Sequence, residues 1–196
     1  MKKLTKKSLI ILGLFTSLVS YADDTHEMFR EKEPMVTNVS FNSVKQGSTL
    51  SIKDTKGLVL YKESILQSGA YSKGFDLTSL PNGDYYFELD KDMEIEVIPF
   101  NVVSNQVKFK REEKSIIFKP FIRVKDDMVY VSRIAYSESP IEYKIYYLGN
   151  NDLVLSEKSN DEKYFKKVYD FSTAEKGTYL FIIKSEGRKY TKTIKI

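Results

Sequence analysis

The chain has 196 residues, with 31 Lys and Arg against 27 Asp and Glu, and it contains no Cys. The absence of Cys excludes disulfide staples and a thiol nucleophile. Four of the Lys residues and none of the acids fall in residues 1–22, so residues 23–196 have a formal net charge of zero. Without a net positive field the usual electrostatic basis for nucleic-acid binding is missing, and we expect no nucleic-acid partner.

Residues 1–22 have the pattern of a secretory signal peptide. A lysine-rich start precedes the apolar run Leu9–Val19, and small residues stand at Ser20 and Ala22, which predicts cleavage between Ala22 and Asp23. The apolar run is shorter than the roughly 20 residues of a membrane-spanning helix. The sequence therefore predicts export by the Sec machinery, with no transmembrane segment after processing.

Residues 23–33 are charged and show no strand pattern, which predicts a flexible leader. The only His of the chain, His26, falls in this leader. A protein metal site needs three or four converging ligands, so a lone His in such a segment is expected to be solvated.

Residues 34–108 are predicted to form a first β-domain. Short β-rich runs at 35–42, 50–52, 58–61, 71–77, 85–89 and 95–99 are separated by turn residues such as Asp54–Gly57 and Pro81–Gly83. No run shows the apolar stripe of an amphipathic helix. The charge-rich stretch Asn101–Ser115 is the candidate domain boundary and is predicted to be a solvated linker or edge.

Residues 109–196 are predicted to form a second β-domain. Its expected strands lie at 116–118, 121–124, 128–131, 141–147, 153–155, 179–183 and 189–194. Phe75–Leu89 has a counterpart in Tyr169–Ile183, 94 positions later, and Leu58-Val59-Leu60 recurs 95 positions later. Such offsets are typical of a duplicated unit. The fold class is therefore predicted to be all-β, with two tandem antiparallel immunoglobulin-like or fibronectin-III-like β-sandwiches.

Three residue pairs recur in the duplicated stretch, and each has a structural interpretation. Gly83 and Gly177 are expected to provide backbone freedom at a turn. Tyr85 and Tyr179 are expected to be corner tyrosines, whose hydroxyl ties a strand to a nearby connection. Asp76 and Asp170 are expected to accept hydrogen bonds from backbone amides of that connection.

Catalytic, cofactor and metal sites are not indicated by any motif. Calcium would need six to eight converging oxygens, and the Asp residues are scattered over different turns. Neither a G-x-S-x-G stretch, nor H-E-x-x-H, nor a phosphate-binding glycine loop is present. A carboxylate-based hydrolase remains an alternative, but the sequence favours a protein that is not an enzyme and has no cofactor.

The pattern aromatic-Asp-Leu-x-x-Leu-Pro-x-Gly-x-Tyr, followed by a final hairpin, resembles small β-sandwich modules secreted by the Bacteroidetes. It is similar to the C-terminal sorting domain of their Por (type IX) secretion system. Gly177–Ile183 with the basic end Lys189, Lys192 and Lys195 matches that ending best. Two departures are Ala174-Glu175-Lys176 in place of Leu-Pro-x and the same unit at mid-chain. The resemblance implies a sandwich fold and involvement of the type IX machinery.

We expect an exported, non-catalytic protein of the periplasm, cell surface or exterior, acting as a binding or structural module with a protein or glycan partner. One alternative is that the C-terminal sandwich is a sorting signal. A second is a small carbohydrate-binding module or hydrolase. Sugar binders usually present a planar aromatic platform; Trp is absent, and Tyr136, Tyr146, Tyr147 or Tyr164 would have to supply it.

Overall fold

The computed structural model describes residues 36–136, 138–160 and 163–196. The predicted signal peptide, the leader and the cleavage site at Ala22 and Asp23 lie outside the described residues. Those residues form fifteen β-strands and two short 3₁₀ turns, so the fold is all-β, and every strand pair is antiparallel.

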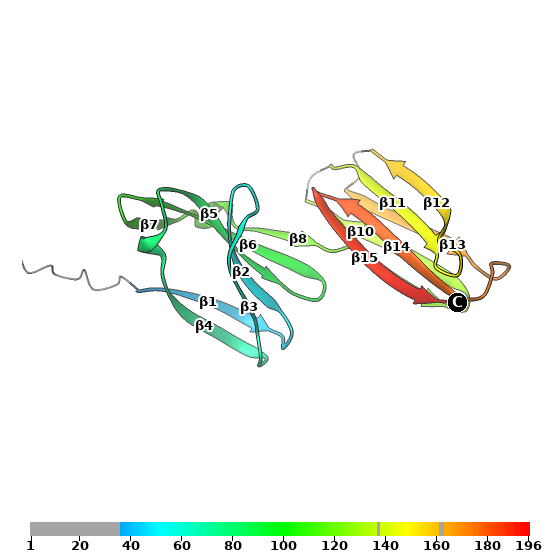
Figure 1. The fold of residues 1–196 in the computed structure, drawn as a ribbon, viewed down its shortest axis with the longest axis horizontal. Coiled ribbons are helices and arrows are strands. Elements are labelled where there is room, and N and C mark those ends of the chain that lie inside the picture. The colour runs from blue at the N-terminus through cyan, green and yellow to red at the C-terminus, as the bar shows by residue number, and fades with distance from the viewer. Residues whose placement is uncertain (1–35, 137, 161–162) are drawn as a thin grey trace, which may run out of the picture. The chain divides into compact units, whose positions relative to one another are not determined.

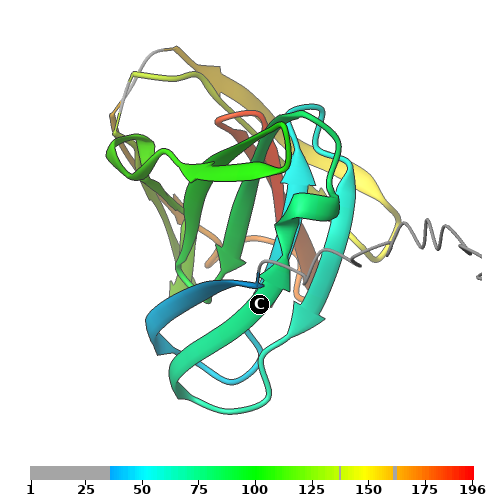
Figure 2. The same cartoon turned by 90° about the vertical axis from the view of Figure 1, so that its left-hand side faces the viewer.

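The N-terminal half consists of two facing sheets (Figure 1). The smaller sheet pairs β1 (Val36–Val44) with β4 (Gly69–Asp76), and Figure 2 shows these two strands, blue and green, side by side. The larger sheet has the order β3-β2-β5-β6-β7, with β8 also on β6. Its strands are β2 (Thr49–Asp54), β3 (Val59–Ser64), β5 (Gly83–Asp90), β6 (Glu94–Val103), β7 (Gln106–Phe109) and β8 (Ser115–Phe118).

The C-terminal half is also built from two sheets. One has the order β13-β10-β9 and the other β12-β11-β14-β15. Their strands are β9 (Phe121–Lys125), β10 (Met128–Ile134), β11 (Ile141–Tyr147), β12 (Asp152–Ser159), β13 (Tyr164–Asp170), β14 (Thr178–Ser185) and β15 (Arg188–Lys195).

Each half has its own apolar core between its two sheets. Phe41 and Phe75 of the smaller N-terminal sheet pack against Leu50, Phe87 and Phe100 of the larger one. The C-terminal core repeats this arrangement, with residues of β10 and β13 against residues of β11 and β14: Val129, Val131 and Phe165 against Ile141, Tyr143, Ile145 and Phe181. Alternate residues of each strand point inward, as the period of two requires. This packing makes each half a β-sandwich.

The two halves share their strand order and part of their register. β3-β2-β5-β6 corresponds to β12-β11-β14-β15, and β1-β4 corresponds to β10-β13. Ile52 is opposite Phe87, as Ile145 is opposite Phe181. A register shift follows Ile52 in one half and Ile145 in the other. The sequence match aligned Leu58 with Leu153, 95 positions later, but strand pairing aligns Val59 with Leu153 instead. Val59 pairs with Lys53 of β2, and Leu153 pairs with the equivalent Tyr146 of β11. The tripeptide match is therefore shifted by one residue from the structural equivalence.

The expectation that Asn101–Ser115 links two domains was wrong, because this stretch is folded onto the N-terminal sheet; the alternative of a solvated edge fits, since β7 is an edge strand and most of these residues are exposed. It contains the end of β6, all of β7 and the 3₁₀ turn η2 (Arg111–Glu113). Two of its charged residues form ion pairs with that sheet: Lys110 Nζ lies 3.0 Å from Asp84 Oδ1, and Lys114 Nζ lies 2.6 Å from Glu96 Oε1. The predicted boundary after residue 108 falls inside β7, and β8 still pairs with β6.

Candidate functional site

The repeated Asp and Tyr residues form the same corner in both halves. Asp76 Oδ1 accepts the N–H of Thr78 at 3.1 Å, in the 3₁₀ turn η1 (Leu77–Ser79). Asp170 Oδ1 accepts the N–H of Ser172 at 2.8 Å. Hydrogen bonds from the Ser172 side chain and backbone lower the pKa of Asp170. These carboxylates therefore hold the turn that enters β5 or β14.

Each repeated tyrosine ties its strand to the preceding turn. The hydroxyl of Tyr85 donates to the Pro81 carbonyl at 2.8 Å, and that of Tyr179 to the Glu175 carbonyl at 2.7 Å. Both rings are buried in the sandwich cores. All these partners are local to one corner, so the repeated residues have a structural explanation in both halves.

The repeated glycines were expected to supply backbone freedom, and this was wrong, because neither has a positive φ angle. Asn82 lacks one too; its side-chain oxygen accepts the N–H of Ser104 at 2.9 Å instead. Gly177 is instead in close packing: a Cβ there would lie 2.6 Å from Cε2 of Tyr147, so the end of that side chain would have to shift. A Cβ at Gly83 would lie 3.5 Å from the Tyr85 hydroxyl, an ordinary contact.

We expect Gly177→Ala to lower the free energy of unfolding by about 1–3 kcal/mol, the usual cost of overpacking, and Gly83→Ala to change it by less than about 0.5 kcal/mol. The new methyl group has to displace the Tyr147 ring, whose hydroxyl donates to Glu175 at 2.9 Å. Urea unfolding followed by circular dichroism measures both. In a Tyr147→Ala background, Gly177→Ala should cost much less; equal losses at both glycines would contradict the close-packing explanation.

A repeated ion pair bridges the sheets in each half, and the sequence interpretation missed it. In the N-terminal half, Nζ of Lys73 on β4 lies 2.6 Å from Oε2 of Glu63 on β3. In the C-terminal half, Nζ of Lys167 on β13 lies 3.6 Å from Oε2 of Glu157 on β12. Burial acts to raise the pKa of Glu63, but hydrogen bonds from Lys73 and Tyr61 outweigh it and lower the pKa. The spacing of 94 residues between equivalent members could have revealed both pairs.

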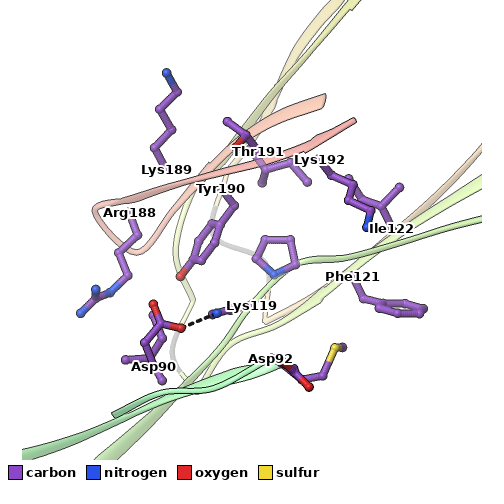
Figure 3. Close-up of a pocket in the computed structure, with 14 residues that line it drawn as sticks. Asp90, Asp92, Lys119, Phe121, Ile122, Arg188, Lys189, Tyr190, Thr191 and Lys192 are labelled. Atoms are coloured by element: carbon purple, nitrogen blue, oxygen red, sulfur yellow. Dashed lines mark ion pairs between the residues drawn. The ribbon is translucent and has the colours of Figure 1, made fainter. Parts of the chain in front are cut away.

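A pocket of about 510 Å³ lies at the connection between β8 and β9 (Figure 3). The ammonium group of Lys119, which lines this pocket, already has two partners in the protein. Its Nζ lies 2.5 Å from Asp90 Oδ1 and donates a hydrogen bond to the Lys91 carbonyl at 2.5 Å. Figure 3 shows Tyr190 pointing toward this pair, and burial raises the pKa of Tyr190. Arg188, also on the wall, pairs with Glu88. Most of the charge around this pocket is therefore neutralised by neighbouring side chains.

Glu88 is the most enclosed acid among the described residues, with 4% of its side chain exposed. It accepts hydrogen bonds from Lys53 of β2 and from Arg188 of β15. Burial alone would raise the pKa of Glu88, but the hydrogen bonds from Arg188 and Lys53 lower it below its usual range. The carboxylate is thus held ionised as an ion-pair centre, without the raised pKa of a general acid.

The outward surface of the sheet β13-β10-β9 carries exposed rings and cations. We call this surface the C-terminal outer face; its residues are Phe121, Arg123, Lys125, Met128, Tyr130, Ser132, Ile134, Tyr164, Lys166, Val168 and Asp170. Tyr130 is flanked by Arg123 on one side and Val168 on the other, and Ser132 by Phe121 and Lys166. A shallow pocket of about 400 Å³ lies among these side chains.

The corresponding surface of the N-terminal half is small and uncharged at its centre. Pairing of β1 with β4 places Asn38 opposite Gly74 and Ser40 opposite Ser72. The Ser40 and Ser72 hydroxyls are hydrogen-bonded to each other at 2.9 Å. Among the described residues, no strand equivalent to β9 extends this sheet. The halves thus share a framework but differ on this surface.

Of the tyrosines considered for a sugar platform, only Tyr164 lies on the C-terminal outer face, with 76% of it exposed. Tyr136 is stacked on Phe118, Tyr147 packs against Tyr179, and Tyr146 belongs to β11. The sequence interpretation overlooked Phe121, Arg123, Tyr130 and Lys166. Reading alternate residues along 121–125, 128–134 and 164–170 would have found them.

Within the described ranges, no group of three or more His, Cys, Asp and Glu could hold a metal ion. In the same ranges, no helix is long and apolar enough to cross a membrane.

No family model and no curated protein matches the chain. Among solved structures, the chain is similar to one described as "Biofilm associated protein - BSP domain", at 17% identity and a TM-score of 0.29. The match covers 83% of this chain and 27% of that one. A likeness of this size carries no functional information.

Proposed function

We propose that this protein is an exported, non-catalytic β-sandwich protein of the bacterial cell envelope or exterior that works by surface contact. The observation that carries the proposal is the difference between equivalent surfaces of the two halves. Asn38 and Ser72 of the N-terminal half are replaced by Tyr130 and Lys166 on the C-terminal outer face. Folding does not require exposed rings and cations at these positions, because the N-terminal half forms the same framework without them.

Two further features support the proposal. Residues 1–22 have the signal-peptide pattern, which favours export. The best enclosed carboxylate, Glu88, is paired with two cations and has a lowered pKa, which suits an ion pair better than acid–base catalysis. Contact through a surface, without turnover of a substrate, accounts for these features together.

Fractionation of cells that produce the full chain, with intact mass spectrometry of each fraction, tests the proposal. We expect the mass of residues 23–196 in the periplasmic, surface or culture-medium fraction. Uncleaved protein confined to the cytoplasm would overturn export. An external product that lacks the C-terminal half would instead favour the type IX sorting-signal alternative for that half.

The non-catalytic part of the proposal has its own test. The isolated protein should release no reducing sugar from soluble polysaccharides and no product from chromogenic esters or glycosides. Turnover that disappears in Glu88→Gln would contradict the proposal and support the carboxylate-hydrolase alternative.

A further inference from the structure

The cations of the C-terminal outer face lack strong acidic partners. Among the described residues, neither Arg123 nor Lys166 has an ion-pair partner. Nζ of Lys125 lies 3.9 Å from Oδ2 of Asp126. Both side chains are largely exposed, so this ion pair is weak. Asp161 and Glu162 lie outside the described residues. Against the three cations Arg123, Lys125 and Lys166, the face carries one acid, Asp170. The face is therefore positive although residues 23–196 are neutral overall.

Aromatic rings alternate with these cations. Phe121, Tyr130 and Tyr164 are 45%, 37% and 76% exposed. Directly opposed residues on neighbouring strands have Cβ atoms about 5 Å apart, so the ring of Tyr130 and the guanidinium of Arg123 belong to adjacent positions on the face. Lys166 and Phe121 flank Ser132 in the next row. Exposed rings and positive charges therefore occupy neighbouring positions across the face, and we call this arrangement the grid of rings and cations.

We propose that the C-terminal outer face binds an acidic polysaccharide, a polymer of sugar rings that carry carboxylates. Arg and Lys donate charge-assisted hydrogen bonds to carboxylates. An exposed aromatic ring offers an apolar surface to the C–H face of a sugar, and a tyrosine adds a hydroxyl for hydrogen bonding. This inference names the partner of the proposed surface contact and rests on that proposed function.

The composition of the face favours this partner over other polyanions. A double-stranded nucleic acid is usually bound by a broad positive surface that contacts many phosphates, whereas this face carries only the cations Arg123, Lys125 and Lys166. A polyanion without rings would match the cations but would leave three exposed aromatic side chains unexplained. A polymer that offers sugar faces and carboxylates in regular alternation uses both components of the grid. Single-stranded nucleic acid, whose bases stack on aromatic rings, is the competitor that the test has to separate from it.

Affinity electrophoresis of the chain from Asp23 onward, in gels containing polygalacturonate, neutral dextran or poly-glutamate, tests the proposal. We expect retardation by polygalacturonate and none by dextran. Arg123→Gln with Lys166→Gln should weaken polygalacturonate binding roughly tenfold, the loss of about two exposed charge pairs. Tyr164→Ala should weaken binding to polygalacturonate and leave any binding to poly-glutamate unchanged. Lys195→Gln, which removes an exposed charge from β15, is the matched control.

Each remaining outcome would overturn the inference. Unchanged retardation in the Arg123 and Lys166 double variant would place binding elsewhere. Equal loss with Lys195→Gln would reduce the effect to general charge. Stronger binding to single-stranded DNA, or to vesicles of anionic lipid, than to polygalacturonate would exclude an acidic glycan as the preferred partner. If the protein is exported intact yet binds no polysaccharide, this inference falls and the proposed function stands; if it is not exported, the proposed function falls.

Discussion

Replacing Phe181 with Ala should lower the free energy of unfolding of the C-terminal half by about 3–5 kcal/mol, the usual cost of deleting a buried aromatic ring. Phe181 is 1% exposed and packs in a core that shares no residue with the N-terminal core. The unfolding of the N-terminal half should therefore change by less than about 1 kcal/mol. Urea titration followed by two-dimensional amide NMR resolves the two halves, which contain no Trp for fluorescence.

Phe87→Ala is the matched control, because Phe87 occupies the equivalent position opposite Ile52 and is fully buried. It should destabilise the N-terminal half by a similar amount. Phe181→Leu, a milder change, should give a smaller loss in the same half and keeps the test informative if the Ala variant does not fold. A single transition that moves as a whole in every variant would mean that the two halves unfold as one cooperative unit.

Replacing Glu88 with Gln should lower the free energy of unfolding at neutral pH by about 2–3 kcal/mol, because the partners of a largely buried charge then lose their counter-charge. Lys53 and Arg188 both pair with this carboxylate. The hydrogen bonds that lower the pKa of Glu88 also set the pH dependence. The stabilisation is complete above the unfolded pKa of about 4.3 and is lost as the pH falls through the lower folded pKa.

Thermal unfolding between pH 2 and pH 8 measures this effect. The wild-type protein should lose more stability than Glu88→Gln as the pH falls below about 4. Glu94→Gln is the control: Glu94 pairs with Lys91 at 3.0 Å but is more exposed, so its loss should be under about 1 kcal/mol. Parallel pH profiles for the wild type and Glu88→Gln would show that the pairs with Lys53 and Arg188 contribute no net stability.

The repeated stretch was the most informative part of the sequence. Turn residues and period-two alternation predicted β-strands that form two antiparallel sandwiches, because both signals are local. The roles of Gly83 and Gly177 were not predictable in this way. The close packing at Gly177 comes from the ring of Tyr147, which is distant in sequence, and no local pattern indicates such an approach.

Long-range pairing also explains the error at Asn101–Ser115. A run of alternating charges resembles a solvated linker when its partners are unknown. In the structure Lys110 forms an ion pair with Asp84 of β5, and Lys114 forms one with Glu96 of β6. Both strands precede this stretch in the sequence. The same reason hid the C-terminal outer face: Arg123, Tyr130 and Lys166 become neighbours only when β9 and β13 pair with β10.

The unequal surfaces of the two halves determine the valency of the molecule. Among the described residues only the C-terminal outer face combines rings and cations in this way, because β1 and β4 present Ser, Asn and Gly at the equivalent positions. Under the proposed polysaccharide contact, a molecule with one such face can coat a polymer but cannot cross-link two polymer strands by that face alone. Bridging would require several chains held together, and the apparent affinity would then rise with the number of linked copies.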